Sequence, residues 1–168
     1  MVYMGSYQAI LKQQVISNIV INFLIAYFLS TATLATITTI PLQAPQDNIM
    51  ALNMAGDLMV GSFIMGVILT TVLTLIMRLQ LRNKTIAVPE HLALSIIAKL
   101  PSNLLARGLV VGFLSMCLVG VPTAILLAVF GIMQASTHDY IFYHGIYAGL
   151  LGGAMSYVVA KRVILEQS

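Results

Sequence analysis

The sequence predicts an all-α membrane protein built as a bundle of four transmembrane helices. Of its 168 residues 60% are hydrophobic and only 8% are charged, and the mean hydropathy is +0.98. Soluble domains carry about 25% charged residues, so this chain could not cover a surface that faces water. It also contains four long apolar runs, each at or above the ~20 residues that cross a bilayer. Residues 1–168 are therefore predicted to form a single four-helix transmembrane domain.

The first two spans are predicted at 15–40 and 54–77. The apolar run that follows Lys12 is longer than the 7–15 residues usual for a secretory signal core, so we expect it to stay in the membrane as a span and not to be cleaved. Between the two spans, Pro41 and Pro45 precede an Asp-Asn pair. These residue types favour a turn, because proline fixes φ and Asp and Asn bond to nearby backbone.

A long polar segment, 78–103, separates the two apolar halves of the chain. Within it, Pro89–Leu100 is predicted to form a short helix with one apolar side. Such a helix is typical of a segment that lies along the membrane surface. A helix that docks a partner protein is the alternative interpretation.

The third and fourth spans are predicted at 104–133 and 139–160, with Pro122 inside the third. Phe28-Leu29-Ser30 in the first span is echoed by Phe113-Leu114-Ser115 in the third. We therefore hypothesise a parallel repeat of two hairpins, an organisation that some transporters use.

The basic residues predict the orientation of the spans. With four spans, the N-terminus, the segment 78–103 and the C-terminus lie on one side of the membrane, and all eight basic residues fall on that side. Positive residues concentrate in cytoplasmic loops, so both termini are predicted to be cytoplasmic, and a dual-topology transporter is disfavoured. The same residues are expected to contact anionic lipid headgroups, not nucleic acid. They are Lys12, Arg78, Arg82, Lys84, Lys99, Arg107, Lys161 and Arg162.

Two acidic residues and a histidine form a candidate ion or proton site on the outer side. Asp57 lies near the outer boundary of the second span. It is either an acidic residue favoured by the dipole of a helix start, or a functional carboxylate of the kind that membranes rarely tolerate otherwise. His144 lies about one turn deeper than the start of the fourth span and could pair with Asp57, giving a site that titrates near neutral pH. Asp139 is the third candidate, although its position is more typical of a helix start.

On the inner side, Arg107, Asn18 and Asn22 are expected at a similar depth. A polar contact among them would satisfy groups that lipid cannot. Snorkelling of Arg107 to lipid phosphates is the simpler alternative.

Small residues recur every four positions in the last two spans, at Gly145, Gly149 and Gly153 and again at Gly108 and Gly112. Such stripes allow close helix packing, either inside the bundle or between copies of the protein.

Other polar side chains gather near the outer side. A hydroxyl-rich wall that could line a polar conduit is expected from Ser30, Thr31, Thr33, Thr36, Thr38 and Thr39. Three tyrosines of the fourth span are interpreted as interfacial anchors, namely Tyr140, Tyr143 and Tyr147.

The sequence contains no recognisable hydrolase, metalloprotease or phosphate-binding motif, and its single cysteine, Cys117, belongs to no metal-ligand pattern. No cofactor or metal is expected. Glu90, His91 and Lys99 lie where an enzyme acting on lipid headgroups would work, which keeps that function class open.

Two stretches carry a family resemblance. They are Leu100-Pro101-x-x-Leu104-Leu105-x-Arg107-Gly108-Leu109 and Tyr143-x-Gly145-x-Tyr147-x-Gly149-x-x-Gly152. Both resemble segments of uncharacterised small four-helix bacterial inner-membrane proteins. The resemblance implies the four-helix topology and the bacterial inner membrane, and it implies no activity.

Three function classes follow as expectations. The first is a non-enzymatic assembly or interaction subunit, either a homo-oligomer or part of a membrane complex. The second is a small transporter or channel with an outer polar site around Asp57. The third is a membrane-interfacial enzyme.

Overall fold

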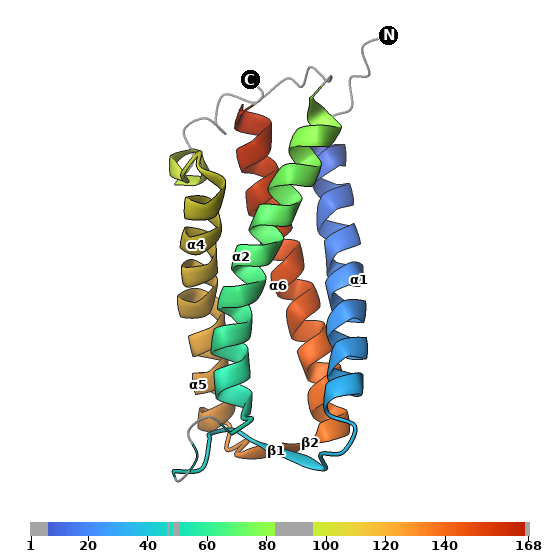
Figure 1. Cartoon of the computed structure of the whole chain (residues 1–168), viewed down its shortest axis with the longest axis vertical. Helices are drawn as coiled ribbons and strands as arrows, with labels where there is room; N and C mark the ends of the chain where they lie inside the picture. Colours follow the sequence, from blue (N-terminus) through green and yellow to red (C-terminus); the bar gives the residue numbers. More distant parts are fainter. Residues whose placement is uncertain (1–6, 47, 49–50, 83–95, 167–168) are drawn as a thin grey trace.

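The computed structural model of the chain describes residues 7–46, 48, 51–82 and 96–166. Within them, four helical stretches are long and apolar enough to cross a membrane (Figure 1). Large apolar side chains cover the outside of the bundle, as a lipid environment requires. The predicted all-α fold and the multi-pass membrane class are confirmed. The stretches are α1 (Tyr7–Thr33), α2 (Met54–Leu81), the continuous run of α4 (Leu104–Ser115), η2 (Met116–Gly120) and α5 (Val121–Val129), and α6 (Thr137–Glu166).

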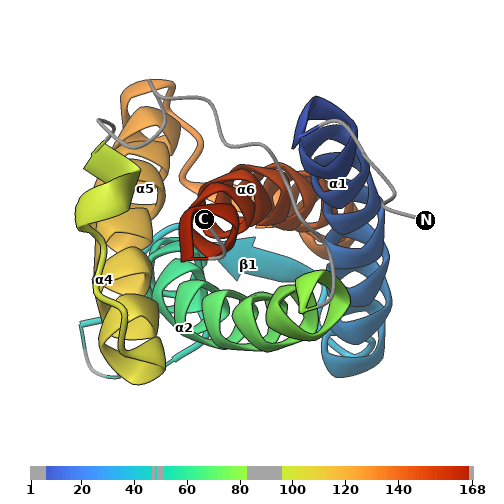
Figure 2. The same ribbon diagram turned by 90° about the horizontal axis from the view of Figure 1, so that it is seen from above.

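The helices α2 and α6 occupy the centre of the bundle, with α1 on one side and the run α4–η2–α5 on the other (Figure 2). The closest packing joins α1 to α6 and α4 to α2. The first helix of each half therefore packs on the second helix of the other half. This exchange is what a parallel repeat of two hairpins would produce, and the repeat itself stays a hypothesis.

The first span differs from the prediction at both ends, because α1 begins eight residues earlier and ends at Thr33. The following residues instead form the strand β1 (Thr39–Pro41), which pairs antiparallel with β2 (Gln134–Ser136). Threonine and isoleucine favour extended backbone. Pro41 is tolerated because the Leu42 N–H, and not that of position 41, bonds to the neighbouring strand segment, at the Met133 carbonyl. The continuous apolar run of the sequence concealed this change from helix to strand.

The third span contains a turn of π-helix, η2, which ends two residues before Pro122. Proline has no N–H and its ring clashes with the carbonyl four residues earlier, so a regular helix cannot pass through it unchanged. Here the Val121 N–H bonds to the Met116 carbonyl, five residues back. The helix ends at Val129, four residues before the predicted end, and the chain turns at Gly131, whose φ is +73°.

The helix α2 continues to Leu81, so the polar segment predicted at 78–103 is described at 78–82 and again at 96–103. The second of these stretches contains a single turn of 3-10 helix, η1 (Ile96–Lys99). Most of the predicted surface helix at Pro89–Leu100 lies outside the described residues. After η1, Asn103 caps α4 by accepting a hydrogen bond of 3.1 Å from the Ala106 N–H.

The two ends of the bundle differ in charge. We call the end that holds the start of α1, the end of α2, η1 and the end of α6 the inner end, and the opposite end, with β1 and β2, the outer end (Figure 1). Every described basic residue belongs to the inner end, whereas Asp57 and Asp139 start helices at the outer end. The described basic residues are Lys12, Arg78, Arg82, Lys99, Arg107, Lys161 and Arg162.

Both glycine stripes are buried inside the bundle. A Cβ added at Gly149 would lie 2.9 Å from the Ile19 carbonyl oxygen of α1, too close for a real contact. In the same way, a Cβ at Gly66 of α2 would lie 2.5 Å from the Gly112 Cα of α4. The glycines therefore allow α6 to pack closely against α1, and α4 against α2. Of the two predicted uses of these stripes, the structure shows packing inside the bundle.

Candidate functional site

Four side chains from three helices meet near the outer end of the bundle, and we call them the outer polar cluster: Ser30, Asp57, Tyr140 and His144. The Tyr140 hydroxyl donates a hydrogen bond to Asp57 Oδ2. The His144 Nε2 lies 3.6 Å from the same oxygen, and His144 Nδ1 lies 2.9 Å from the Ser30 hydroxyl. The cluster thus joins α1, α2 and α6 through one imidazole ring.

Local structure puts each member of the outer polar cluster in place. Asn53 caps α2 by accepting a 2.7 Å hydrogen bond from the Gly56 N–H, so Asp57 falls in the first turn, where the helix dipole favours a carboxylate. Tyr140 and His144 are four residues apart on α6 and therefore share one face. Their rings stack with centroids 5.6 Å apart.

Apolar residues cover the outer polar cluster on one side, and another side is open to the surface of the bundle. Ile40 of β1, Leu42 and Met54 pack with Tyr140 into a buried apolar cluster. These apolar residues leave Tyr140 almost fully buried, whereas the side chains of Asp57 and His144 remain 32% and 21% exposed. The carboxylate and the imidazole can therefore be reached from the surface of the bundle.

A second polar contact lies deeper, where the Tyr147 hydroxyl is 2.6 Å from the Ser62 hydroxyl. Ser62 also donates to the Leu58 carbonyl of its own helix. Still further inward, the Gly66–Gly112 approach brings α2 and α4 into backbone contact, and the Met155 side chain fills the adjoining space. This closely packed layer therefore separates these polar contacts from the next described polar side-chain contact between α2 and another helix, that of Thr74 with Arg107 near the inner end.

Asp57 and His144 lie close together, as predicted, but two tyrosines differ from the prediction. Tyr140 and Tyr147 were predicted to anchor the protein in the headgroup region, and instead both point into the bundle and bond to α2. The signal that could have identified them is the spacing of Tyr140, His144 and Tyr147, which puts all three on one helical face.

Asp139 does not join the outer polar cluster. Its carboxylate accepts a 2.6 Å hydrogen bond from Ser136, its N–H donates to the same hydroxyl, and its side chain is 78% exposed. It acts as a helix-start residue of α6.

The expected hydroxyl wall does not form either. Thr31 and Thr33 bond to carbonyls of their own helix and lie exposed, and the three later threonines lie beyond the end of α1. Of that set, Ser30 belongs to the outer polar cluster, through its contact with His144.

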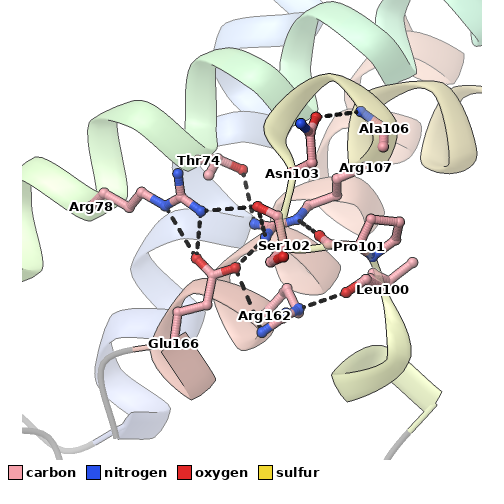
Figure 3. Close-up of polar contacts among 10 residues, drawn as sticks. All are labelled: Thr74, Arg78, Leu100, Pro101, Ser102, Asn103, Ala106, Arg107, Arg162 and Glu166. Carbon is pink, nitrogen blue, oxygen red and sulfur yellow. Dashed lines mark hydrogen bonds and ion pairs between the residues drawn. The ribbon is translucent and has the colours of Figure 1, made fainter.

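At the inner end, three arginines surround one carboxylate, and we call this group the inner arginine cluster: Arg78, Arg107, Arg162 and Glu166 (Figure 3). Arg78 donates to Glu166 Oε2 through Nε at 3.1 Å and Nη2 at 2.8 Å. Arg107 pairs with Glu166 Oε1, and Arg162 Nη1 lies 3.6 Å from the same oxygen. The cluster ties together the ends of α2, α4 and α6.

Arg107 is fully buried and does not snorkel. Besides Glu166, its guanidinium donates to the backbone carbonyls of Pro101 at 2.9 Å and Ser102 at 3.3 Å, and Nη1 lies 3.5 Å from the Thr74 hydroxyl. A carboxylate from the end of α6, beyond the predicted span, makes this burial tolerable, because a buried charge needs a partner.

The expected contact of Arg107 with Asn18 and Asn22 does not form. Each asparagine donates at 2.8 Å to the carbonyl four residues earlier in α1. The reason is that α1 packs against α6, whereas Arg107 belongs to α4, which lies on the other side of the bundle (Figure 2).

Among the described residues, no group of three or more His, Cys, Asp or Glu side chains is placed to hold a metal ion. Glu90 and His91, two of the three residues on which the enzyme hypothesis rests, lie outside the described residues.

Comparisons of the chain with protein families, with curated proteins and with solved structures found no match. The resemblance to small bacterial inner-membrane proteins stays a prediction.

Proposed function

We propose that this protein is a small proton-coupled membrane transporter and that the outer polar cluster is its proton-binding site. The observation that carries the proposal is the contact of the Asp57 carboxylate with both Tyr140 and His144. Ionisable side chains within membrane spans are costly and generally serve ion or proton pathways. An assembly role was the first of the three function classes expected from the sequence, but the glycine stripes that such a role could use pack inside the bundle.

The geometry provides a way to couple proton binding to movement. An imidazole can carry a proton on either ring nitrogen or on both. A proton added to the His144–Asp57 pair changes the attraction between α6 and α2. It also decides whether His144 Nδ1 accepts a hydrogen bond from the Ser30 hydroxyl of α1 or donates one to it. One protonation event therefore alters contacts among three helices.

A transporter fits the described interior better than an open cation channel. The close approach of Gly66 and Gly112 leaves no continuous polar passage along this contact between α2 and α4. The inner arginine cluster would in addition repel a cation on its way out. Movement of helices, and not diffusion through a fixed pore, is the mechanism that these contacts support.

Proton flux into reconstituted vesicles tests the proposal. With a pH-sensitive dye inside and an imposed pH gradient, the wild-type protein should acidify the lumen faster than empty vesicles do. Asp57→Asn should reduce the rate to that of empty vesicles. Asp139→Asn is the matched control, because it makes the same chemical change at the same end of the bundle but outside the cluster. Equal rates for the wild type and Asp57→Asn would refute the assignment.

A second candidate, an assembly or interaction subunit, is favoured by one observation on the outer surface. A groove of about 210 Å³ runs between α1 and α6 on the lipid-facing side. Side chains from a helix of a second copy or of another membrane protein could occupy it. A photo-crosslinker placed at Val20 in the groove should then give protein adducts, and one at Phe113, on the opposite side of the bundle, should give only lipid adducts. Lipid adducts alone at both positions would remove this candidate. The groove is lined by Ile19, Val20, Phe23, Ile146, Gly149 and Leu150.

We further propose that the protein resides in a bacterial inner membrane with both termini in the cytoplasm. The segregation of the described basic residues at the inner end supports this orientation.

A further inference from the structure

The charges of the inner arginine cluster do not balance. Three guanidinium groups face the single carboxylate of Glu166 among the described residues. Asp57 and Asp139 lie at the other end, and Asp47 and Glu90 lie outside the described residues. Because an unpaired charge at a partly buried site is costly, a further anion is expected there.

The hydrogen bonds of the cluster indicate where that anion binds. Arg107 uses all three of its guanidinium nitrogens in contacts within the protein. The contacts of Arg78 with described residues use Nε and Nη2 and leave Nη1. Those of Arg162 use Nε and Nη1 and leave Nη2. Arg78, with a side-chain exposure of 37%, is the accessible donor.

The backbone fixes the direction of these donors in advance. The Ser102 carbonyl accepts from Arg78 Nη2 at 3.3 Å, and the Leu100 carbonyl accepts from Arg162 Nε at 3.0 Å (Figure 3). A guanidinium that is already held in place loses little freedom when it binds a ligand. Its planar set of N–H donors suits phosphate oxygens, and such charge-assisted hydrogen bonds are among the strongest in proteins.

We propose that the inner arginine cluster binds a phosphate group, with Arg78 as its principal donor. The proposal rests on the surplus of positive charge among the described residues, on the oriented donors, and on their place at the end of the membrane-spanning helices. Phospholipid headgroups lie at the level where spans end, so an anionic phospholipid can deliver that phosphate without leaving the membrane. A soluble phosphate ion has the same binding chemistry, and the experiment separates the two sources.

Thermal unfolding of the purified protein in an uncharged detergent tests this site. Phosphatidylglycerol, phosphatidylcholine or inorganic phosphate is added in increasing concentration, and the unfolding temperature is recorded. We expect phosphatidylglycerol to raise the Tm in a saturable way and phosphatidylcholine to leave it unchanged. A rise caused equally by inorganic phosphate would support the phosphate site and assign it to the soluble ion.

Three variants decide whether the effect is specific. Arg78→Gln should need about tenfold more phosphatidylglycerol for the same Tm rise, a loss of about 1.4 kcal/mol of binding free energy. Arg82→Gln is the matched control, because it removes one charge from an exposed position four residues further along and should keep the wild-type response. Arg78→Lys, which keeps the charge but loses the planar donor set, should behave like Arg78→Gln, and it carries the test if Arg78→Gln does not fold. Equal losses for the position 78 variants and Arg82→Gln would reduce the effect to unspecific attraction and overturn the proposal.

Discussion

The Tyr140 hydroxyl, at the start of α6, donates a hydrogen bond to the Asp57 carboxylate at the start of α2. The two residues are 83 positions apart in the sequence, yet both lie in the first turns of their helices. The bond joins the two central helices at the outer end, next to the buried apolar cluster that Ile40 of β1, Leu42 and Met54 form with Tyr140. It also leaves the second contact of Asp57, with His144, at the accessible side.

Replacing Tyr140 by phenylalanine should lower the stability of the bundle by about 1–3 kcal/mol, because the Asp57 carboxylate loses a donor in a partly buried place. Unfolding in a mixed-detergent series would measure the change. Tyr143→Phe is the control, since Tyr143 stacks on Tyr147 and packs against the same apolar cluster as Tyr140, while its described contacts include no hydrogen bond of the hydroxyl. A loss of equal size in both variants would show that the ring environment matters and the hydroxyl does not.

At the inner end, Glu166→Gln should destabilise the protein by about 3 kcal/mol, because fully buried Arg107 then keeps its charge without an anionic partner. Asp139→Asn makes the same chemical change at an exposed helix start and should cost under about 0.5 kcal/mol. Thermal unfolding in detergent compares the two. Similar Tm values for Glu166→Gln and the wild type would mean that Glu166 does not compensate Arg107.

The position of Gly149 makes it a probe of the fold and not of oligomerisation. Leucine at position 149 would push its side chain into the Ile19 carbonyl and the Phe23 side chain of α1, so we expect a loss of about 3 kcal/mol or failure to fold. Ala154→Leu enlarges an exposed residue of the same helix and should be tolerated. Yields of monodisperse protein after mild extraction would separate the two. Normal folding of Gly149→Leu would contradict the observed packing of α6 on α1.

The proposed orientation predicts which residues can be labelled from outside the cell. In a Cys117→Ala background, Gln134→Cys of β2 should react with a membrane-impermeant thiol reagent on intact cells. Arg82→Cys, exposed just after α2, should react only after the membrane is permeabilised. The reverse pattern would place the inner end outside the cytoplasm.

Much of the fold could be predicted because the membrane simplifies the problem. In lipid every backbone polar group must be satisfied locally, so a long apolar run is a helix wherever it crosses the bilayer. The four spans follow from that rule. The rule does not hold near the ends of spans, where water or another strand can satisfy the backbone. There Thr39–Pro41 forms a strand instead of continuing the first helix, and α6 extends to Glu166, beyond the predicted span.

The candidate site divides in the same way. The sequence by itself determined that Asp57 and His144 lie at similar depth near one end of their spans, because helical rise converts residue number into depth. It also determined that the basic residues gather on one side. Only the tertiary structure decided which helices are neighbours. Helical rise gives depth but not the order of the helices around the bundle, and the glycine contacts of α6 with α1 and of α4 with α2 supply that order. For this reason the asparagines of α1 lie away from Arg107, while Tyr140 reaches Asp57 and Glu166 reaches Arg107.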